Sequence, residues 1–303
     1  MEKLGDISIQ MRCNRFMKLS VFKPSKLQWL FSHDVARKHP FRTVWRLINW
    51  ELIRILNRTV ESRYDGNFDV TLLPREGASR LAYYFGVSEP ELFAFYEGFL
   101  KPGMTVVDAG ANIGLHTLFF AKRVGPEGRV YAFEPGQSAF GRLKSHVERN
   151  QLANVHCFHC ALGASEGVVA ITENCHDNSR NFVVESSSGT NGTRNVVLRS
   201  LDQVLKKEGV GRVDFLKIDV EGFEPQVLEG VSNYLRQQSI RVLQLELDDS
   251  SLARSGYTAA QVSNMLHDAG YRCAEWSCQS RSFRAASKAS FNTFFVTENE
   301  LVQ

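Results

Sequence analysis

The sequence predicts an α/β fold built on a doubly wound, mostly parallel sheet with an antiparallel C-terminal edge. From Pro102 to Leu247, short β-rich runs alternate with helical runs, as they do where helices connect parallel strands. Connections between parallel strands are almost always right-handed, so successive helices cover both faces of the sheet. Two further β-rich runs, 271–276 and 291–297, follow a helical run at 259–270 and predict the antiparallel edge.

Each element of the alternating region has its own pattern. The predicted strands, rich in β-branched and aromatic residues, are 105–110, 129–135, 154–163, 213–222 and 241–247. The predicted helices, with apolar residues at helical spacing, are 114–124, 138–152, 199–206 and 225–237. The polar segment 172–195 interrupts this order, and so long a loop in a compact domain is usually functional or disordered. A ligand of such a sheet should bind at the carboxyl ends of its strands.

We place the main domain at residues 88–303 and a basic N-terminal extension, made of helices and a hairpin, at residues 1–87. Residues 40–57 predict an amphipathic helix that could dock onto the main domain or lie on a membrane, with docking the favoured use. Residues 60–73 alternate around an Asp-Gly turn and predict the hairpin. Residues 76–100 predict a helical segment with a break in its middle.

Composition excludes several classes of protein. Of the 303 residues, 43% are hydrophobic, which is enough to form a core and excludes a mainly disordered chain. No run approaches the roughly 20 apolar residues of a membrane-spanning helix, and the first residues lack the apolar core of a secretory signal. The six cysteines have neither the density of a disulfide scaffold nor paired zinc-ligand spacing. We therefore expect reduced thiols in a cytoplasmic protein.

Charge is distributed unevenly along the chain. Residues 1–60 contain twelve Lys and Arg against four Asp and Glu, a net charge of +8, so the other 243 residues carry −5. A basic segment of this kind indicates either an acidic partner, such as a membrane surface, or a solvated helical face. No aromatic-basic RNA motif and no recognisable DNA-binding motif accompanies the charge, which argues against a nucleic-acid partner.

The sharpest local motif is VVDAGANIGLHT, in which Asp108 ends a predicted strand and Gly110, Asn112 and Gly114 form the turn into a helix. Glycine lets the backbone approach a ligand closely, and a helix N-terminus offers free N–H groups. Asn112 stands where the dinucleotide pattern G-x-G-x-x-G has its second glycine, and Asp108 would repel a pyrophosphate. The turn therefore indicates a cationic or zwitterionic ligand, unless it is only a strand–helix connection.

Glu134 ends the next predicted strand, about twenty residues after the glycine turn. A carboxylate in this position can accept hydrogen bonds from both hydroxyls of a ribose, whereas the structural alternative is a helix cap. Together with the turn, Glu134 predicts a ligand that contains adenosine.

Four motifs follow one another between about Glu89 and Leu247: DAGANIG, GRVYAFEP, NVHCFHCALG and VDFLKIDVEGFEPQVLEG. Together they resemble the FkbM family of S-adenosylmethionine-dependent methyltransferases. The resemblance implies a class I methyltransferase sheet of Rossmann-like topology, the cofactor S-adenosyl-L-methionine, and mostly O-methylation of hydroxyls on sugars or complex natural products. It implies that the cofactor's amino-acid part is bound by Asp108, Gly110, Asn112 and Gly114. The ribose would be bound by Glu134, and the adenine would contact the backbone of Ala161 and Leu162.

The segment KIDVEGFE follows the fourth predicted strand and supplies the charged residues Lys217, Asp219, Glu221 and Glu224. So many charges beside an apolar strand are costly unless they line a pocket or form a structural salt-bridge cluster. Lys217 could lower the pKa of a neighbouring acid and leave that acid as a base or a substrate anchor. Clustered carboxylates also suit Mg²⁺, but we expect no metal here.

Two further residues are candidates for a general base. His116 follows Gly114 in the first turn of a helix and could deprotonate a hydroxyl, or else face the core. Glu246 ends the strand 241–247 and should face the substrate side of the cleft, unless it is structural. The cluster from His156 to Cys160 looks like a set of metal ligands, but Cys157 and Cys160 should point to opposite faces of an extended strand.

We therefore expect methyl transfer from S-adenosylmethionine to an oxygen of a sugar, a lipid-linked glycan or a natural product, with the base among Asp219, Glu221, Glu246 and His116. The alternative is a non-catalytic cofactor-binding or membrane-associated interaction module. The presence of Asp108, Glu134 and the KIDVEG motif together argues against that alternative. A nicotinamide dehydrogenase is a weaker alternative, because the middle glycine of its motif is missing.

Overall fold

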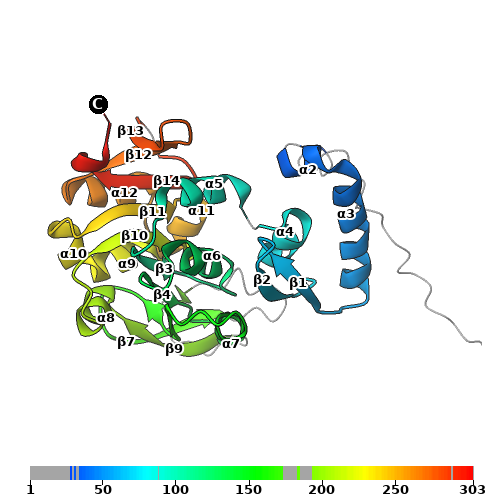
Figure 1. The fold of residues 1–303 in the computed structure, drawn as a ribbon. Helices are drawn as coiled ribbons and strands as arrows, with labels where there is room; N and C mark the ends of the chain where they lie inside the picture. The colour runs from blue at the N-terminus through cyan, green and yellow to red at the C-terminus, as the bar shows by residue number, and fades with distance from the viewer. Residues whose placement is uncertain are drawn as a thin grey trace, which may run out of the picture. The chain divides into compact units, whose positions relative to one another are not determined.

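The computed structural model describes residues 28, 31, 34–87, 89–172, 183–184, 193–287 and 289–302. The chain divides into two compact units, 1–56 and 57–303, which are described separately (Figure 1). The division falls before the predicted hairpin. Residues 57–87 therefore lie in the same compact unit as the main sheet.

The predicted hairpin is present and is tied to the main unit. Its strands and the elements beside it are β1 (Val60–Tyr64), β2 (Phe68–Leu72), α4 (Gly77–Phe85) and α7 (Gln137–Arg149). The backbone N–H of Thr71 in β2 donates to Nε2 of His146 in α7 at 2.9 Å. The backbone N–H of Asp69 donates to Oδ1 of Asn150, which follows α7, at the same distance. These bonds use the free edge of β2, which explains why the hairpin belongs with the sheet.

In the described part of the chain, eight strands form the main sheet in the order β13-β12-β14-β11-β10-β3-β4-β5 (Figure 1). The neighbouring parallel strands are β11 (Ile240–Glu246), β10 (Val213–Ile218), β3 (Thr105–Ala109), β4 (Arg129–Phe133) and β5 (Val155–Phe158). The antiparallel edge is made of β14 (Asn292–Thr297), β12 (Tyr271–Ser277) and β13 (Ser282–Ala285). The predicted α/β class, the parallel order and the antiparallel C-terminal edge are confirmed.

Helices cover both faces of the main sheet. One face packs in a single core cluster with α8 (Leu201–Lys207), α9 (Glu224–Gly230), α10 (Ser232–Arg236) and α12 (Ala259–Asp268). The other face carries α7 together with α5 (Pro90–Phe99) and α6 (Leu115–Val124). On that face Tyr96 of α5 and Phe120 of α6 lie 5.7 and 5.6 Å from the ring of Phe215 in β10. Because side chains alternate along a strand, Lys217 shares this face with Phe215.

One helical prediction differs in detail from the structure, and another is confirmed. The predicted helix 225–237 is divided into α9 and α10 at Val231, and the short α11 (Asp249–Leu252) follows β11. The break predicted within 76–100 is confirmed at Gly86, which ends α4 with a φ of 81°. A positive φ costs glycine little, so Gly86 can stop the helix before α5 begins.

A second, smaller sheet lies beside the main one and was not predicted. Its order is β6-β9-β7-β8, formed by β6 (Ala161–Leu162), β9 (Thr193–Arg199), β7 (Gly167–Thr172) and β8 (Val183–Val184). The predicted strand 154–163 is divided because the ladder with β4 ends at Phe158, after which β6 pairs with β9. β8 lies inside the predicted loop 172–195, most of which is outside the described residues.

The N-terminal unit contains α2 (Asp34–Lys38) and α3 (Pro40–Ile55) in its described part. The predicted amphipathic helix is confirmed as α3, which begins at Pro40, because the first turn of a helix tolerates the missing N–H of proline. None of the described helices combines the length and the hydropathy that crossing a bilayer requires. Most of the basic segment before α2 lies outside the described residues.

Candidate functional site

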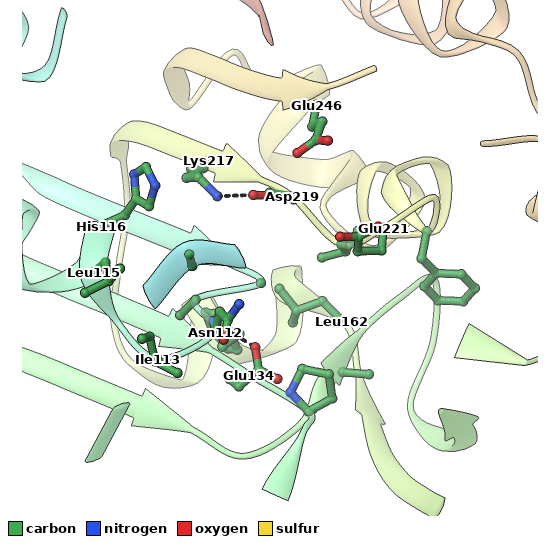
Figure 2. Close-up of a pocket in the computed structure, with 18 of the residues that line it drawn as sticks. Asn112, Ile113, Leu115, His116, Glu134, Leu162, Lys217, Asp219, Glu221 and Glu246 are labelled. Atoms are coloured by element: carbon green, nitrogen blue, oxygen red, sulfur yellow. Dashed lines mark hydrogen bonds and ion pairs between the residues drawn. The ribbon is translucent and has the colours of Figure 1, made fainter. Parts of the chain in front are cut away.

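A cavity of about 270 Å³ lies at the carboxyl ends of β3, β4, β10 and β11 (Figure 2). The turn after β3 and Glu134 after β4 form one part of its wall, and residues after β10 and β11 form another. In Figure 2, Asn112 and Glu134 lie on one side of the view, and Lys217, Asp219 and Glu246 lie on the other. The cavity is therefore at the sheet edge where the sequence predicted a ligand.

The turn after β3 has a backbone that requires glycine. Gly110 and Gly114 have φ angles of 82° and 88°, and Asn112 between them has a φ of 52°. A Cβ atom added to Gly110 would lie 1.8 Å from the carbonyl oxygen of Asp219. The turn is thus packed directly against the backbone that follows β10, and both border the cavity.

Glu134 is a buried carboxylate held by the backbone. Its Oε2 accepts from the N–H of Asn112 and its Oε1 from the N–H of Gly136, both at 2.8 Å. Burial raises the pKa of Glu134 to about 7, although these two hydrogen bonds act in the opposite direction. Each oxygen keeps a further lone pair, so the side chain can still accept hydrogen bonds from a ligand in the cavity.

Asp108 lies behind the glycine turn and is not part of the cavity wall. Its side chain is wholly buried, and Oδ2 accepts from Oγ1 of Thr117 at 2.6 Å. Oδ1 has no hydrogen-bond partner among the described residues. Burial raises the pKa of this acid, and the charge of Lys217 opposes that rise. Asp108 can therefore act on a ligand through its charge rather than through exposed surface.

Lys217 and Asp219 form a buried ion pair at the end of β10. The Nζ of Lys217 lies 2.7 Å from Oδ2 of Asp219, and the lysine side chain is only 3% exposed. Burial disfavours the charge of Lys217, but Asp219 and Asp108 hold its pKa above the ordinary value. Lys217 is therefore charged, and its charge is already balanced by the chain's own acids.

Glu246 extends this cluster from the end of β11. Its carboxyl group is hydrogen-bonded to that of Asp219. Burial, with the neighbouring charge of Asp219, raises the pKa of Glu246 to about 9. Burial would also raise the pKa of Asp219, but the charge of Lys217 lowers it below the ordinary value. At neutral pH the shared proton therefore belongs to Glu246, which donates to Asp219.

Two acids of the KIDVEGFE segment have different surroundings. Glu221 lines the cavity and forms an ion pair of 3.8 Å with Arg254. Glu224 is buried outside the cavity wall, where its Oε1 accepts from the N–H groups of Val220 and Gly222 at 3.1 and 3.2 Å. Glu224 therefore fixes the turn that carries Glu221, and its oxygens are not presented to a ligand.

His116 and Glu89 form a second pair on the cavity wall. Nε2 of His116 lies 3.9 Å from Oε2 of Glu89. Burial lowers the pKa of His116 to about 3, so this side chain is neutral and a weak base. Burial raises the pKa of Glu89, which precedes the first turn of α5. Glu89 was not among the residues predicted for the site, although its position directly before Pro90 marks the start of a helix.

Ala161 and Leu162 border the cavity from β6, as does Cys160 before them. Cys157 packs instead with the apolar cluster around Leu143, so the two cysteines do separate as expected for an extended strand. Within the described ranges, no group of three or more His, Cys, Asp or Glu side chains is arranged to hold a metal ion.

Comparison with known proteins identifies the family. The model of the FkbM methyltransferase domain matches residues 108–273, which is more than half of the chain. The methyltransferase sdnD of Sordaria araneosa is 30% identical over 66% of this chain and 90% of its own length. The hexuronic acid methyltransferase AglP of Haloferax volcanii is 26% identical over 54% of this chain and 61% of its own length.

A further relative agrees with this result. The 31-O-demethyl-FK506 methyltransferase FkbM of Streptomyces tacrolimicus is 30% identical over 44% of this chain and 62% of its own length. Among solved structures, an FkbM methyltransferase from Methylobacillus flagellatus covers 84% of this chain and 59% of its own, with a TM-score of 0.43 and 13% identity. The match of the family model to residues 108–273 shows that the chain belongs to the FkbM family of methyltransferases, whose cofactor is S-adenosylmethionine.

Proposed function

We propose that this chain methylates a hydroxyl oxygen of a sugar, a lipid-linked glycan or a natural product. The proposal rests on one observation: a single cavity is lined by two sets of residues. One is Glu134, a carboxylate that is hydrogen-bonded to the glycine turn and suited to a ribose, and the other is the cluster of acids around Lys217. The name of one relative supports this acceptor class, since it methylates an oxygen of the natural product 31-O-demethyl-FK506. Another relative acts on a sugar, a hexuronic acid, but its name does not say which oxygen is methylated.

The residues present fit S-adenosylmethionine in the part of the cavity around Asn112. When bound, this cofactor supplies a methyl group attached to a positively charged sulfur. Glu134 would accept hydrogen bonds from the ribose, because its oxygens border the cavity and have lone pairs to spare. The turn through Gly110, Asn112 and Gly114 would hold the amino-acid part, with the buried charge of Asp108 behind it. Ala161 and Leu162 would border the adenine.

We assign the general base to Glu246. Burial raises the pKa of Glu246 to about 9, so its deprotonated form, which accumulates as the pH rises toward that value, is a strong carboxylate base. Asp219 is a weaker base, since Lys217 lowers its pKa, and His116 is weaker because burial lowers its pKa to about 3. Asp219 and Lys217 would instead position Glu246 through the shared hydrogen bond. Glu221 at the rim would contact the acceptor.

The charges on the wall favour a hydroxyl acceptor over a carboxylate. Glu89, Asp219, Glu221 and Glu246 all line the cavity, and the positive charge of Lys217 is balanced by Asp219 and Asp108. An anionic acceptor oxygen would meet carboxylates of its own sign in a poorly solvated space. A neutral hydroxyl meets no such repulsion, and carboxylates stabilise the positive charge that develops on its oxygen as it is methylated.

The test is a panel of matched acceptors, assayed for release of S-adenosylhomocysteine. Each neutral glycoside is paired with the uronic acid of the same sugar, so the two differ only in the carboxylate. The proposal predicts turnover of neutral members and weaker turnover of their acids. Binding of S-adenosylmethionine without transfer to any hydroxyl would favour the non-catalytic alternative, and preferred turnover of the acids would contradict the hydroxyl assignment.

A further inference from the structure

The helix α3 has a buried face and an exposed apolar stripe on opposite sides of its axis. At about 3.6 residues per turn, Thr43, Leu47 and Trp50 fall on one side, and all three are buried. The apolar stripe, made of large side chains that are all exposed, consists of Phe41, Trp45, Ile48, Leu52, Ile55 and Leu56. Burial of the first face already accounts for the packing of an ordinary amphipathic helix. The exposed stripe therefore needs a separate explanation.

The stripe is large and continuous. Its members recur at intervals of three or four residues along the whole helix, so neighbouring members are adjacent on the helix surface. Phe41 is 90% exposed and Trp45 is 62% exposed, although aromatic side chains of this size are rarely left in water. Contiguous exposed apolar surface of this extent marks an interaction site.

The charges beside the stripe select its partner. Residues 34–58 contain six Lys and Arg against two Asp and Glu, and one of those acids, Glu51, is paired with Arg54 at 2.7 Å. Arg42 lies next to Phe41 and Trp45 on the helical wheel and is exposed, as are Lys38 and Arg58 near the two ends of α3. A second copy of the chain would place these like charges opposite one another, which disfavours self-association.

We propose that α3 is an interfacial helix that lies on an acidic phospholipid membrane, with the stripe from Phe41 to Leu56 in the acyl boundary. An apolar stripe with aromatic residues and basic neighbours is the pattern of helices that lie in the plane of the interface. The basic residues attract anionic headgroups near such a surface. This surface would hold the enzyme where a lipid-linked acceptor is found, but the proposal does not depend on the identity of the acceptor.

The experiment measures co-sedimentation of the full-length protein with vesicles of phosphatidylcholine alone and of phosphatidylcholine with phosphatidylglycerol. We expect binding to the acidic vesicles that weakens as salt is added, and little binding to the neutral ones. The double variant Phe41→Ser with Trp45→Ser should lose about tenfold or more of its partition into acidic vesicles. The variant Arg42→Glu should bind acidic vesicles more weakly than the wild-type protein at low salt. At high salt, where charges are screened, the two proteins should bind these vesicles to a similar extent.

The matched control is a second exposed apolar pair. Val168 in β7 and Val197 in β9 are cross-strand partners on the small sheet, 68% and 46% exposed. Their double change to Ser should leave vesicle binding unaltered. Unchanged helicity and unchanged S-adenosylmethionine affinity in the α3 variants would show that both units are still folded.

Three results would overturn the proposal. The first is absence of binding to acidic vesicles by the wild-type protein. The second is equal vesicle binding by the wild-type protein and the Phe41→Ser, Trp45→Ser variant. The third is a dimer in solution that the same variant dissociates, since this would assign the stripe to a second copy of the chain.

Discussion

Asp108 and Lys217 are register partners on adjacent parallel strands, β3 and β10, and both side chains are buried on the same face of the sheet. Lys217 also contacts Asp219, so one buried cation is balanced by two acids. Asp108 lies behind the glycine turn, and Asp219 lies on the cavity wall. This arrangement connects the part of the cavity that we assign to the cofactor with the part that we assign to the acceptor.

Replacing Lys217 with Met should lower the free energy of unfolding by about 3–5 kcal/mol, because two acids would be left buried without their cation. Adding Asp108→Asn to Lys217→Met should recover part of this loss, as expected for a coupled pair. Lys122→Met is the matched control, since Lys122 is half-exposed and lies 3.6 Å from Asp65 on the surface. It should cost less than about 1 kcal/mol. Urea denaturation measures all the variants, and equal losses for the two lysines would contradict the buried network.

Replacing Gly110 with Ala should abolish measurable binding of S-adenosylmethionine and lower the melting temperature. The added Cβ would overlap the carbonyl oxygen of Asp219, so the turn and the strand behind it cannot both keep their positions. Gly125→Ala is the control, because Gly125 also has a positive φ, of 65°, but no atom lies within 4 Å of the added Cβ. That change should cost about 1–3 kcal/mol and leave cofactor affinity intact. Calorimetric titration with the cofactor distinguishes the two, and normal affinity in the Gly110→Ala variant would remove the turn from the site.

Replacing Glu224 with Gln should stabilise the protein at pH 8 and leave its stability at pH 5 nearly unchanged. Burial raises the pKa of Glu224 from 4.5 to about 7, so the folded state binds this proton more tightly than the unfolded state does. The free energy of unfolding therefore falls as pH rises between these two values, by about 3 kcal/mol for a shift of this size. Glutamine can keep the two hydrogen bonds to Oε1 without the ionisation.

The control for this pH effect is Glu275→Gln, because Glu275 is an exposed acid on β12. The melting temperature of this variant should stay close to that of the wild-type protein at both pH values. Melting temperatures at the two pH values decide the matter. An equal change at both pH values in the Glu224→Gln variant would contradict the assigned titration.

Replacing Glu246 with Gln should lower turnover by about 10²-fold or more, because the amide cannot accept the hydroxyl proton. The affinity for S-adenosylmethionine should change little, since Glu246 lies at the opposite side of the cavity from Glu134 (Figure 2). In the wild-type protein the rate should rise with pH toward about 9, as the deprotonated form of Glu246 accumulates. The variant should lose this rise. A variant that keeps both the rate and the pH profile would transfer the role of base to another residue.

The cofactor side of the cavity could be predicted from the sequence because its parts are local. Gly110, Asn112 and Gly114 belong to one strand–turn–helix motif, and Glu134 ends the next strand. Because the carboxyl ends of parallel strands lie at one edge of a sheet, the turn and Glu134 are expected at the same edge. The order of residues along the chain predicts that Asp108 lies at a strand end, but not how deeply its side chain is buried. Its burial behind the turn depends on Thr117 and Lys217, and no spacing in the sequence shows it.

The acceptor side could be predicted only in part, because its residues come together from distant segments. Asp219, Glu221 and Glu246 were found at strand ends, but Glu89 arrives from the turn before α5, outside the alternating pattern. The second sheet could not be predicted from the sequence either. Among the described residues, β7 and β9 flank a polar segment and pair with each other and with short strands, so hydrophobic periodicity gives little signal for the second sheet.

The most direct measurement follows the methyl group itself. The protein is given S-adenosylmethionine with a ¹³C-labelled methyl group and a neutral glycoside that the acceptor panel has selected, and the product is examined by ¹³C NMR. We predict a single new signal at the chemical shift of a methyl ether, absent with the Gly110→Ala variant. A label found on nitrogen or as a carboxylate ester, or bound cofactor that is never turned over, would contradict O-methylation of a hydroxyl.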